Sequence, residues 1–114
     1  MALLIVLNRR PGDGTDVAWN AARIANKAQE MGMPTRVFLM NDGVWIAHGD
    51  LAAAGDEAHG FLREALGRGA ELRACGTCLD RAGIPHDKII PEAQVSTLPD
   101  LVRWIAGSDR ILTF

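Results

Sequence analysis

The sequence predicts a three-layer α/β domain, in which helices cover both faces of a mostly parallel sheet of about five strands. Apolar runs of strand length alternate along the chain with segments of helical periodicity, which is typical of parallel strands joined by right-handed crossovers. The first run, residues 2–7, is continuously apolar, as expected of a central strand that is covered on both faces. The length of 114 residues fits one domain, residues 1–114, because no repeat or linker divides the chain.

The first third of the chain predicts a strand, a helix and a second strand. After the strand at residues 2–7, Gly12-Asp-Gly14 predicts a tight turn, since Val17 stands where a dinucleotide fingerprint needs its third glycine. A helix follows at about residues 15–31, with apolar side chains at spacings of three and four. Gly32 ends this helix, and residues 35–40 form the second strand.

The middle of the chain predicts helices separated by a loop. Asn41 or Asp42 could cap a short helix that runs through Ile46 and Ala47. Residues 48–56 are rich in Gly and Asp and are expected to be the most mobile loop. A further helix is predicted at about residues 57–68.

The last third predicts three more strands and two further helices, the first of which follows the strand at residues 70–75. Residues 70–75 read as a strand that leads directly into a pair of cysteines. A weak strand is expected somewhere within residues 88–95. Thr97 is a candidate cap for a helix that carries Leu101, Val102, Trp104 and Ile105, and residues 109–114 form the last strand.

Composition and charge exclude several classes of function. The net charge of −2 and the scattered basic residues argue against direct binding to nucleic acid, which needs several clustered cations. The longest apolar run is too short to span a bilayer, and no export signal is present, so we expect a cytoplasmic protein without a membrane partner. In that reducing compartment, two cysteines are more often catalytic, redox-active or metal-binding than joined in a structural disulfide.

Cys75 and Cys78 lie where the predicted strand at 70–75 gives way to a helix. In open α/β sheets, ligands collect beyond the carboxyl ends of the strands. Thr77 and Asp80 have the spacing of a capping box, which would start the helix near Cys78. The free N–H groups at a helix start stabilise a thiolate. The sequence therefore predicts a reactive sulfur at this junction.

The cysteine spacing by itself leaves four interpretations open. A thioredoxin-like dithiol has this spacing at a helix start. A zinc site needs four ligands, and the two cysteines with His86 supply three, so no metal is expected. An iron–sulfur cluster held by one chain needs more cysteines than the two present. Both cysteines could also be buried apolar residues without chemistry.

The chain resembles the DsrE-like superfamily, which includes the DsrE/DsrF proteins and the TusD subunit of the tRNA-thiolation sulfur relay. The resemblance is carried by residues 3–7, residues 40–44, the segment Cys75-Gly-Thr-Cys78 with Arg81 and Gly83, and residues 109–114. It implies a Rossmann-like fold, assembly into homo-oligomers, and a cysteine that carries sulfur as a persulfide. Cys75 is the position that corresponds to that cysteine. The chain departs from the sulfur-relay members in two ways: it has a second cysteine, Cys78, and Ala82 separates Arg81 from Gly83. The second cysteine is the feature of the CxxC-containing branch.

The resulting hypothesis is a sulfur carrier or sulfurtransferase-like protein without a cofactor, whose partner is a sulfur donor or acceptor protein. Cys75 would accept sulfur as a persulfide, and Cys78 would attack that persulfide, releasing sulfide by thiol exchange. Arg73 or Arg81 would favour the anionic form. Asp42 follows a strand at the same sheet edge as Cys75 and would contact the substrate together with Gly76, Thr77 and Arg81. The hypothesis fails if both thiols are buried away from any opening. Its rivals are an oligomeric binding or assembly module without enzymatic activity and a dithiol–disulfide redox protein.

Overall fold

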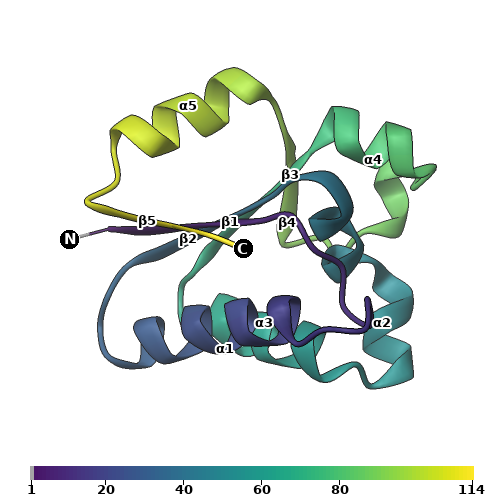
Figure 1. The fold of residues 1–114 in the computed structure, drawn as a ribbon, viewed down its shortest axis with the longest axis horizontal. Helices are drawn as coiled ribbons and strands as arrows, with labels where there is room; N and C mark the ends of the chain where they lie inside the picture. Colours follow the sequence, from purple (N-terminus) through teal and green to yellow (C-terminus); the bar gives the residue numbers. More distant parts are fainter. Residues whose placement is uncertain (1) are drawn as a thin grey trace.

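The computed structural model describes residues 2–114 and contains one five-stranded sheet in the order β4-β3-β2-β1-β5 (Figure 1). All the strand pairs are parallel, so the predicted α/β class is confirmed, with a wholly rather than mostly parallel sheet. The central strand β1 pairs with β2 on one side and with β5 on the other. The strands are β1 (Leu3–Leu7), β2 (Thr35–Leu39), β3 (Glu71–Cys75), β4 (Ala93–Ser96) and β5 (Arg110–Thr113).

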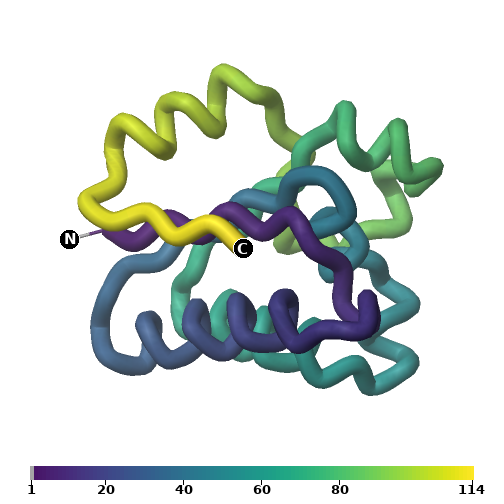
Figure 2. Tube along the Cα trace, viewed as in Figure 1, coloured from purple at the N-terminus to yellow at the C-terminus, as the bar shows by residue number. Residues whose placement is uncertain are grey.

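Helices cover both faces of this sheet (Figures 1 and 2). Two helices, α1 (Val17–Glu30) and α3 (Glu57–Gly67), lie side by side on one face. The opposite face is covered by α5 (Leu98–Ala106), and α4 (Gly76–Ala82) begins directly at the end of β3. The shorter elements are the 3-10 helix η1 (Asn41–Ala47), helix α2 (Gly49–Ala54) and the 3-10 helix η2 (His86–Lys88).

The continuous apolar run of β1 is explained by these two layers. Successive side chains of a strand point to opposite faces. Leu3, Ile5 and Leu7 therefore enter the larger core, which is shared with α1 and α3. Leu4 enters a smaller core that contains Leu101 and Trp104 of α5. A strand buried on both sides has no position where a polar side chain would be solvated.

Two predicted segments differ from the structure. Residues 48–56, expected to be a mobile loop, contain helix α2. His48 accepts the N–H of Asp50 through Nδ1 at 3.1 Å, and Gly55 ends the helix in the left-handed conformation (φ 70°). A side-chain cap at one end and a glycine at the other are sufficient to define a short helix. The weak strand expected somewhere within residues 88–95 is β4, which lies at the end of that window and extends one residue beyond it, to Ser96.

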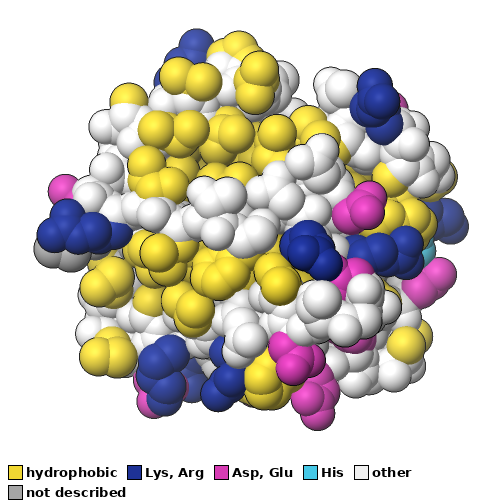
Figure 3. All heavy atoms as spheres, viewed as in Figure 1, with side chains coloured by type: hydrophobic (Ala, Val, Ile, Leu, Met, Phe, Trp, Pro, Cys, Tyr) yellow, Lys and Arg dark blue, Asp and Glu magenta, His cyan; other side chains and the backbone are white. Residues whose placement is uncertain are grey.

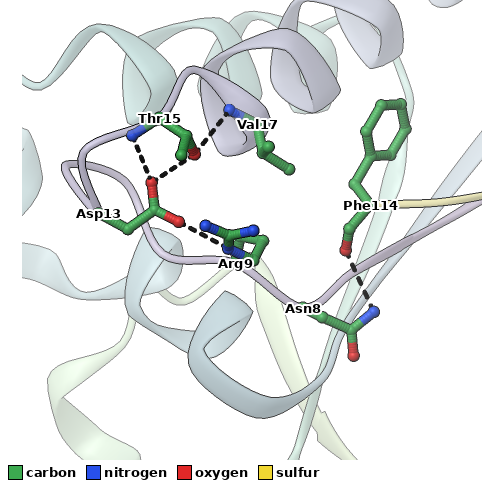
Figure 4. Close-up of polar contacts among 6 residues, drawn as sticks. All are labelled: Asn8, Arg9, Asp13, Thr15, Val17 and Phe114. Atoms are coloured by element: carbon green, nitrogen blue, oxygen red, sulfur yellow. Dashed lines mark hydrogen bonds and ion pairs between the residues drawn. The ribbon is translucent and has the colours of Figure 1, made fainter.

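The predicted tight turn after β1 is confirmed (Figure 4). The Asp13 carboxylate accepts the N–H of Thr15 at 2.9 Å and the Thr15 hydroxyl at 2.6 Å, while Arg9 Nε donates to its other oxygen at 2.7 Å. Gly12 and Gly14 on either side have positive φ angles, which glycine adopts without strain. Within residues 2–114, no helix has both the length and the apolar character needed to cross a bilayer.

Candidate functional site

Cys75 is both the last residue of β3 and the N-cap of α4. Its backbone is extended (φ −61°, ψ 115°), which places Sγ where it accepts the N–H of Cys78 at 3.3 Å. The sulfur thus takes the place that a Ser, Thr, Asp or Asn oxygen commonly has at a helix start. The expected capping box of Thr77 and Asp80 is wrong, because Thr77 already lies inside the helix.

Cys78 is held by a loop from the neighbouring strand. Its Sγ accepts the backbone N–H of Asn41 at 3.2 Å, and Asn41 is the first residue of η1, which follows β2. The carboxyl ends of adjacent parallel strands meet at one edge of a sheet, so β2 and β3 bring together residues 37 positions apart. This confirms the expectation that the segment after β2 lies beside the cysteines.

The two free thiols differ in burial. Cys75 is 9% exposed and packs in the smaller core with Phe38, Leu101 and Trp104. Cys78 is half-buried and lines a surface pocket of about 240 Å³. The pair is therefore not closed off in apolar packing, and its open side is the side of Cys78.

The pocket is formed by five residues from η1 and α4: Asn41, Asp42, Cys78, Arg81 and Ala82. Two of the predicted substrate-contacting residues, Asp42 and Arg81, are among them. The other two, Gly76 and Thr77, are not. A Cβ atom at Gly76 would lie 3.1 Å from Cγ1 of Val95, so this glycine allows the start of α4 to pack closely against β4. Asp42 does not cap η1, whose N-cap is Met40 without a side-chain hydrogen bond.

The surroundings of Cys78 raise the pKa of its thiol above the usual value of 9.0. Burial is the largest cause, because it disfavours the charged form. The hydrogen bond with the Cys75 side chain and the negative charge on Cys75 act in the same direction. The N–H of Asn41 and the guanidinium of Arg81 oppose them by stabilising the thiolate. The raised pKa favours the protonated form of Cys78 near neutral pH.

His86 does not join the cysteines in a metal centre. Its Nε2 lies 2.9 Å from Oδ1 of Asp80, with which it forms a hydrogen bond on the outer side of α4. Among residues 2–114, no three or more His, Cys, Asp or Glu side chains are grouped closely enough to hold a metal ion. The zinc interpretation of the cysteine spacing therefore has no ligand set in the described chain.

Comparison with known proteins places this arrangement in a family. The DsrE/DsrF-like family matches the chain over residues 1–114. The protein belongs to the DsrE/DsrF-like family. This family is known in general for sulfur relay, and the membership confirms the resemblance seen in the sequence.

Members of the DsrE/DsrF-like family and related structures align with this chain over nearly its full length. Protein YchN of Escherichia coli is 30% identical over 98% of this chain and 97% of its own. An uncharacterized protein of Methanopyrus kandleri, MK0008, is also 30% identical, over 98% of this chain and 93% of its own. The crystal structure of YchN superposes with a TM-score of 0.87 at 28% identity, covering 100% of this chain and 99% of YchN. A Bacteroides thetaiotaomicron protein of unknown function shares the fold at a TM-score of 0.76 and 19% identity, covering 99% and 94%.

One residue of the site in this DsrE/DsrF-like protein was not predicted from the sequence as a contact of the cysteines. Asn41 was considered only as a helix cap, whereas its main-chain N–H binds Cys78 Sγ. The available signal was an asparagine directly after a buried strand, a residue type that tolerates positive φ. Asn41 has φ 48° and is the only non-glycine residue with positive φ in the described part of the chain.

Proposed function

We propose that this DsrE/DsrF-like protein carries sulfane sulfur as a persulfide on Cys75, and that Cys78 is the resolving thiol. The observation that carries the proposal is the shared geometry of the pair. Cys75 Sγ accepts an N–H at the first turn of α4, and the second thiol follows within the same turn, at the edge of a pocket. A hydrogen bond donated to sulfur favours its anionic form, which is the nucleophile in thiol chemistry.

In the loading step, the Cys75 thiolate attacks the outer sulfur of a donor persulfide, R–S–SH. The new bond joins Cys75 Sγ to this outer sulfur, and the S–S bond of the donor breaks. The donor leaves as a thiolate and takes up a proton. The transferred sulfur keeps its oxidation state, so no external oxidant or reductant is required.

The carried sulfur can then leave in two ways. An acceptor thiolate can attack the outer sulfur, which returns Cys75 to its thiolate form. Alternatively, deprotonated Cys78 attacks the Cys75 sulfur, and the outer sulfur leaves as sulfide. In that second reaction the two cysteines are oxidised to a disulfide and the sulfane sulfur is reduced, so the electrons balance. A dithiol reductant must reopen the disulfide before the next cycle, which fits a cytoplasmic location.

The pocket beside Cys78 is the proposed approach for the donor or acceptor protein. Arg81 presents a guanidinium there, and Asp42 presents a carboxylate. The cation favours the anionic sulfur species that take part in the transfer. Because Cys75 is only 9% exposed, the reacting sulfur of the donor has to enter past Cys78. The net charge of −2 supports protein or small-molecule partners rather than nucleic acid.

Mass spectrometry after incubation with glutathione persulfide tests the proposal. The wild type is expected to gain sulfur and release sulfide, leaving the Cys75–Cys78 disulfide. The Cys78→Ser variant is expected to retain one added sulfur on Cys75 and to release little sulfide. The Cys75→Ser variant keeps an oxygen at the N-cap position and is expected to take up none.

Retention of the added sulfur by Cys75→Ser would show that the assignment of the carrier is wrong. If no variant gains sulfur while the wild type cycles reversibly between dithiol and disulfide, the protein is a redox protein instead. If neither reaction occurs and loss of both cysteines leaves its associations unchanged, it is a binding or assembly module.

We further propose that the protein assembles with copies of itself through α5. Apolar side chains gather over α5 and around β5 in the view of Figure 3. On α5, Leu98 is 61% exposed, Val102 57% and Ile105 40%, and their spacing places them on one side of the helix. Ile111 of the edge strand β5 is 43% exposed. Apolar patches of this kind mark interaction sites, and the family resemblance implies a second copy as the occupant.

Sedimentation velocity tests this surface. The Val102→Asp variant is expected to shift the protein toward the monomer, because it places a charge in the apolar contact. Met31→Asp is the matched control, since Met31 is 79% exposed and lies at the end of α1 on the other face of the sheet. Equal sedimentation of Val102→Asp and wild type would exclude α5 as the interface.

A further inference from the structure

Asn41 has an unusual backbone conformation and contacts the resolving thiol. Its φ of 48° lies in the left-handed region, which costs most L-residues free energy but is tolerated by asparagine. In this conformation its N–H points at Cys78 Sγ, 3.2 Å away. Because φ relates the N–H of a residue to the chain that follows it, the left-handed φ lets η1 keep its path while this N–H faces Cys78 Sγ.

The side chain of Asn41 is fixed by a second asparagine. Asn41 Nδ2 donates to Oδ1 of Asn8 at 2.8 Å. Asn8 is held in turn by Phe114, whose main-chain oxygen accepts the Asn8 N–H at 2.8 Å and its Nδ2 at 3.2 Å (Figure 4). These amides tie together the segments that follow β2, β1 and β5. The loop carrying Asn41 is thereby anchored to the centre of the sheet.

The main chain around Asn41 is anchored as well. The N–H of Met40 donates to the Leu7 carbonyl at 2.9 Å, and the N–H of Gly43 donates to Met40 at 2.8 Å. Gly43 packs directly on the Leu7 carbonyl, where a Cβ atom would lie 2.7 Å from the carbonyl carbon. The position of the Asn41 N–H is therefore set by the end of β1, independently of the cysteine segment.

We propose that Asn41 is a positioning residue for Cys78, whose left-handed backbone, clamped by Asn8, directs its N–H at the Cys78 sulfur and stabilises the thiolate that resolves the persulfide. The inference rests on the proposed function. It assigns to Asn41, the first residue of η1, a role in the step in which Cys78 attacks the Cys75 persulfide and sulfide is released. The loading step uses the sulfur of Cys75, which Asn41 does not contact through any hydrogen bond among the described residues. The role of Asn41 is therefore tested on sulfide release, the step that Cys78 performs.

The electrostatics of Cys78 agree with this role. Burial disfavours its thiolate, and the N–H of Asn41 is one of two groups that oppose burial, the other being Arg81. Cys75 also acts on Cys78, in the same direction as burial, and Asp42 lines the same pocket. None of these groups is changed by substitution at Asn41, so a change in Cys78 reactivity can be assigned to the N–H.

The direct test measures alkylation of Cys78 by iodoacetamide as a function of pH, in the Cys75→Ser background so that a single thiol reacts. Adding Asn41→Ala is expected to move the midpoint upward and to slow alkylation at about pH 8 roughly tenfold, the effect of one pKa unit. Adding Asn41→Gly is expected to preserve most of the rate, because glycine adopts positive φ freely. A purely structural role of Asn41 would not raise the pH midpoint of alkylation in Asn41→Ala while leaving it nearly unchanged in Asn41→Gly.

Two results would overturn the inference: an Asn41→Ala profile that coincides with that of the parent, or an Asn41→Gly variant as slow as Asn41→Ala. If Asn41→Ala does not fold, Asn8→Ala decides, because it frees the Asn41 side chain without altering residue 41. A raised midpoint in Asn8→Ala supports the inference, and an unchanged midpoint contradicts it.

The sulfur assay separates this inference from the proposed function. With Cys75 intact, sulfide release is timed from protein already loaded with sulfur, and Asn41→Ala is expected to release sulfide about tenfold more slowly than the wild type. Alkylation requires no sulfur donor. A shifted alkylation profile together with no sulfur loading by the wild type would therefore refute the carrier function alone, whereas sulfur loading by the wild type together with an unshifted profile would refute the role of Asn41 alone.

Discussion

The contact between Gly43 and the end of β1 gives a prediction whose sign and size follow from the structure. In Gly43→Ala the added methyl group would overlap the Leu7 carbonyl, lying 2.7 Å from its carbon, and would lie 3.3 Å from the Asn8 nitrogen. All these atoms belong to the main chain, so no side chain can rotate away. Either β1 or η1 must shift, and the hydrogen bond from Met40 to Leu7 shifts with it.

The expected cost of Gly43→Ala is about 3 kcal/mol in the free energy of unfolding, at the upper end of typical overpacking penalties. At about 2.1 cal/mol/K per residue, the unfolding entropy of a chain this long makes each kcal/mol worth about 4 °C, so the melting temperature should fall by about 12 °C. Urea denaturation measures the free energy, and thermal unfolding followed by circular dichroism measures the temperature. Because η1 carries Asn41, sulfide release should slow in the same variant.

Gly60→Ala is the matched control. Gly60 lies within α3, and a Cβ atom there would meet nothing within 4 Å. Alanine is the better helix former, so this variant should be stabilised by about 0.8 kcal/mol and its melting temperature should rise by about 3 °C. If the free energy of unfolding of Gly43→Ala lies within about 0.5 kcal/mol of the wild-type value, as for a typical surface substitution, the close approach of η1 to β1 is refuted.

Three further substitutions test the packing and the charges. Leu62→Ala should lower the free energy of unfolding by about 2–5 kcal/mol in urea, because Leu62 is 1% exposed, and equality with the exposed control Met31→Ala would contradict this. The Thr15 hydroxyl and N–H lower the pKa of Asp13 below 3.8, so the Asp13 carboxylate stabilises the fold above that pH and this contribution is lost as the pH falls. The free energy of unfolding of Asp13→Asn should therefore fall less in acid than that of the wild type, and an equal fall in both proteins would disprove this. Because the pKa of Cys78 is raised above 9.0 in the folded protein, its protonated thiol contributes stability below pH 9.0, and this contribution is lost as the pH rises further. The free energy of unfolding of Cys78→Ser should therefore fall less at alkaline pH than that of the wild type.

The layered fold could be predicted from the sequence because burial dictates local patterns. A strand covered on both faces is apolar at every position, as β1 is from Leu3 to Leu7, and a helix packed on one side repeats its apolar residues every three or four positions. Thr97 was correctly predicted as a cap, since it accepts the N–H of Asp100 in the adjacent turn. Helix α2 was missed because its cap is a histidine, a residue type without a strong capping preference.

By itself, the sequence determined that two cysteines stand where a strand gives way to a helix, and that the segment after β2 lies at the same edge of the sheet. It could not determine which thiol faces the solvent. That depends on α5, whose Leu101 and Trp104 cover Cys75 from far along the chain and leave Cys78 at the pocket. Nor could it show that Asn41 directs its N–H at Cys78, because a hydrogen bond between residues 37 positions apart exists only once β2 and β3 pair. Local patterns reflect burial, whereas contacts between side chains depend on the register of the sheet.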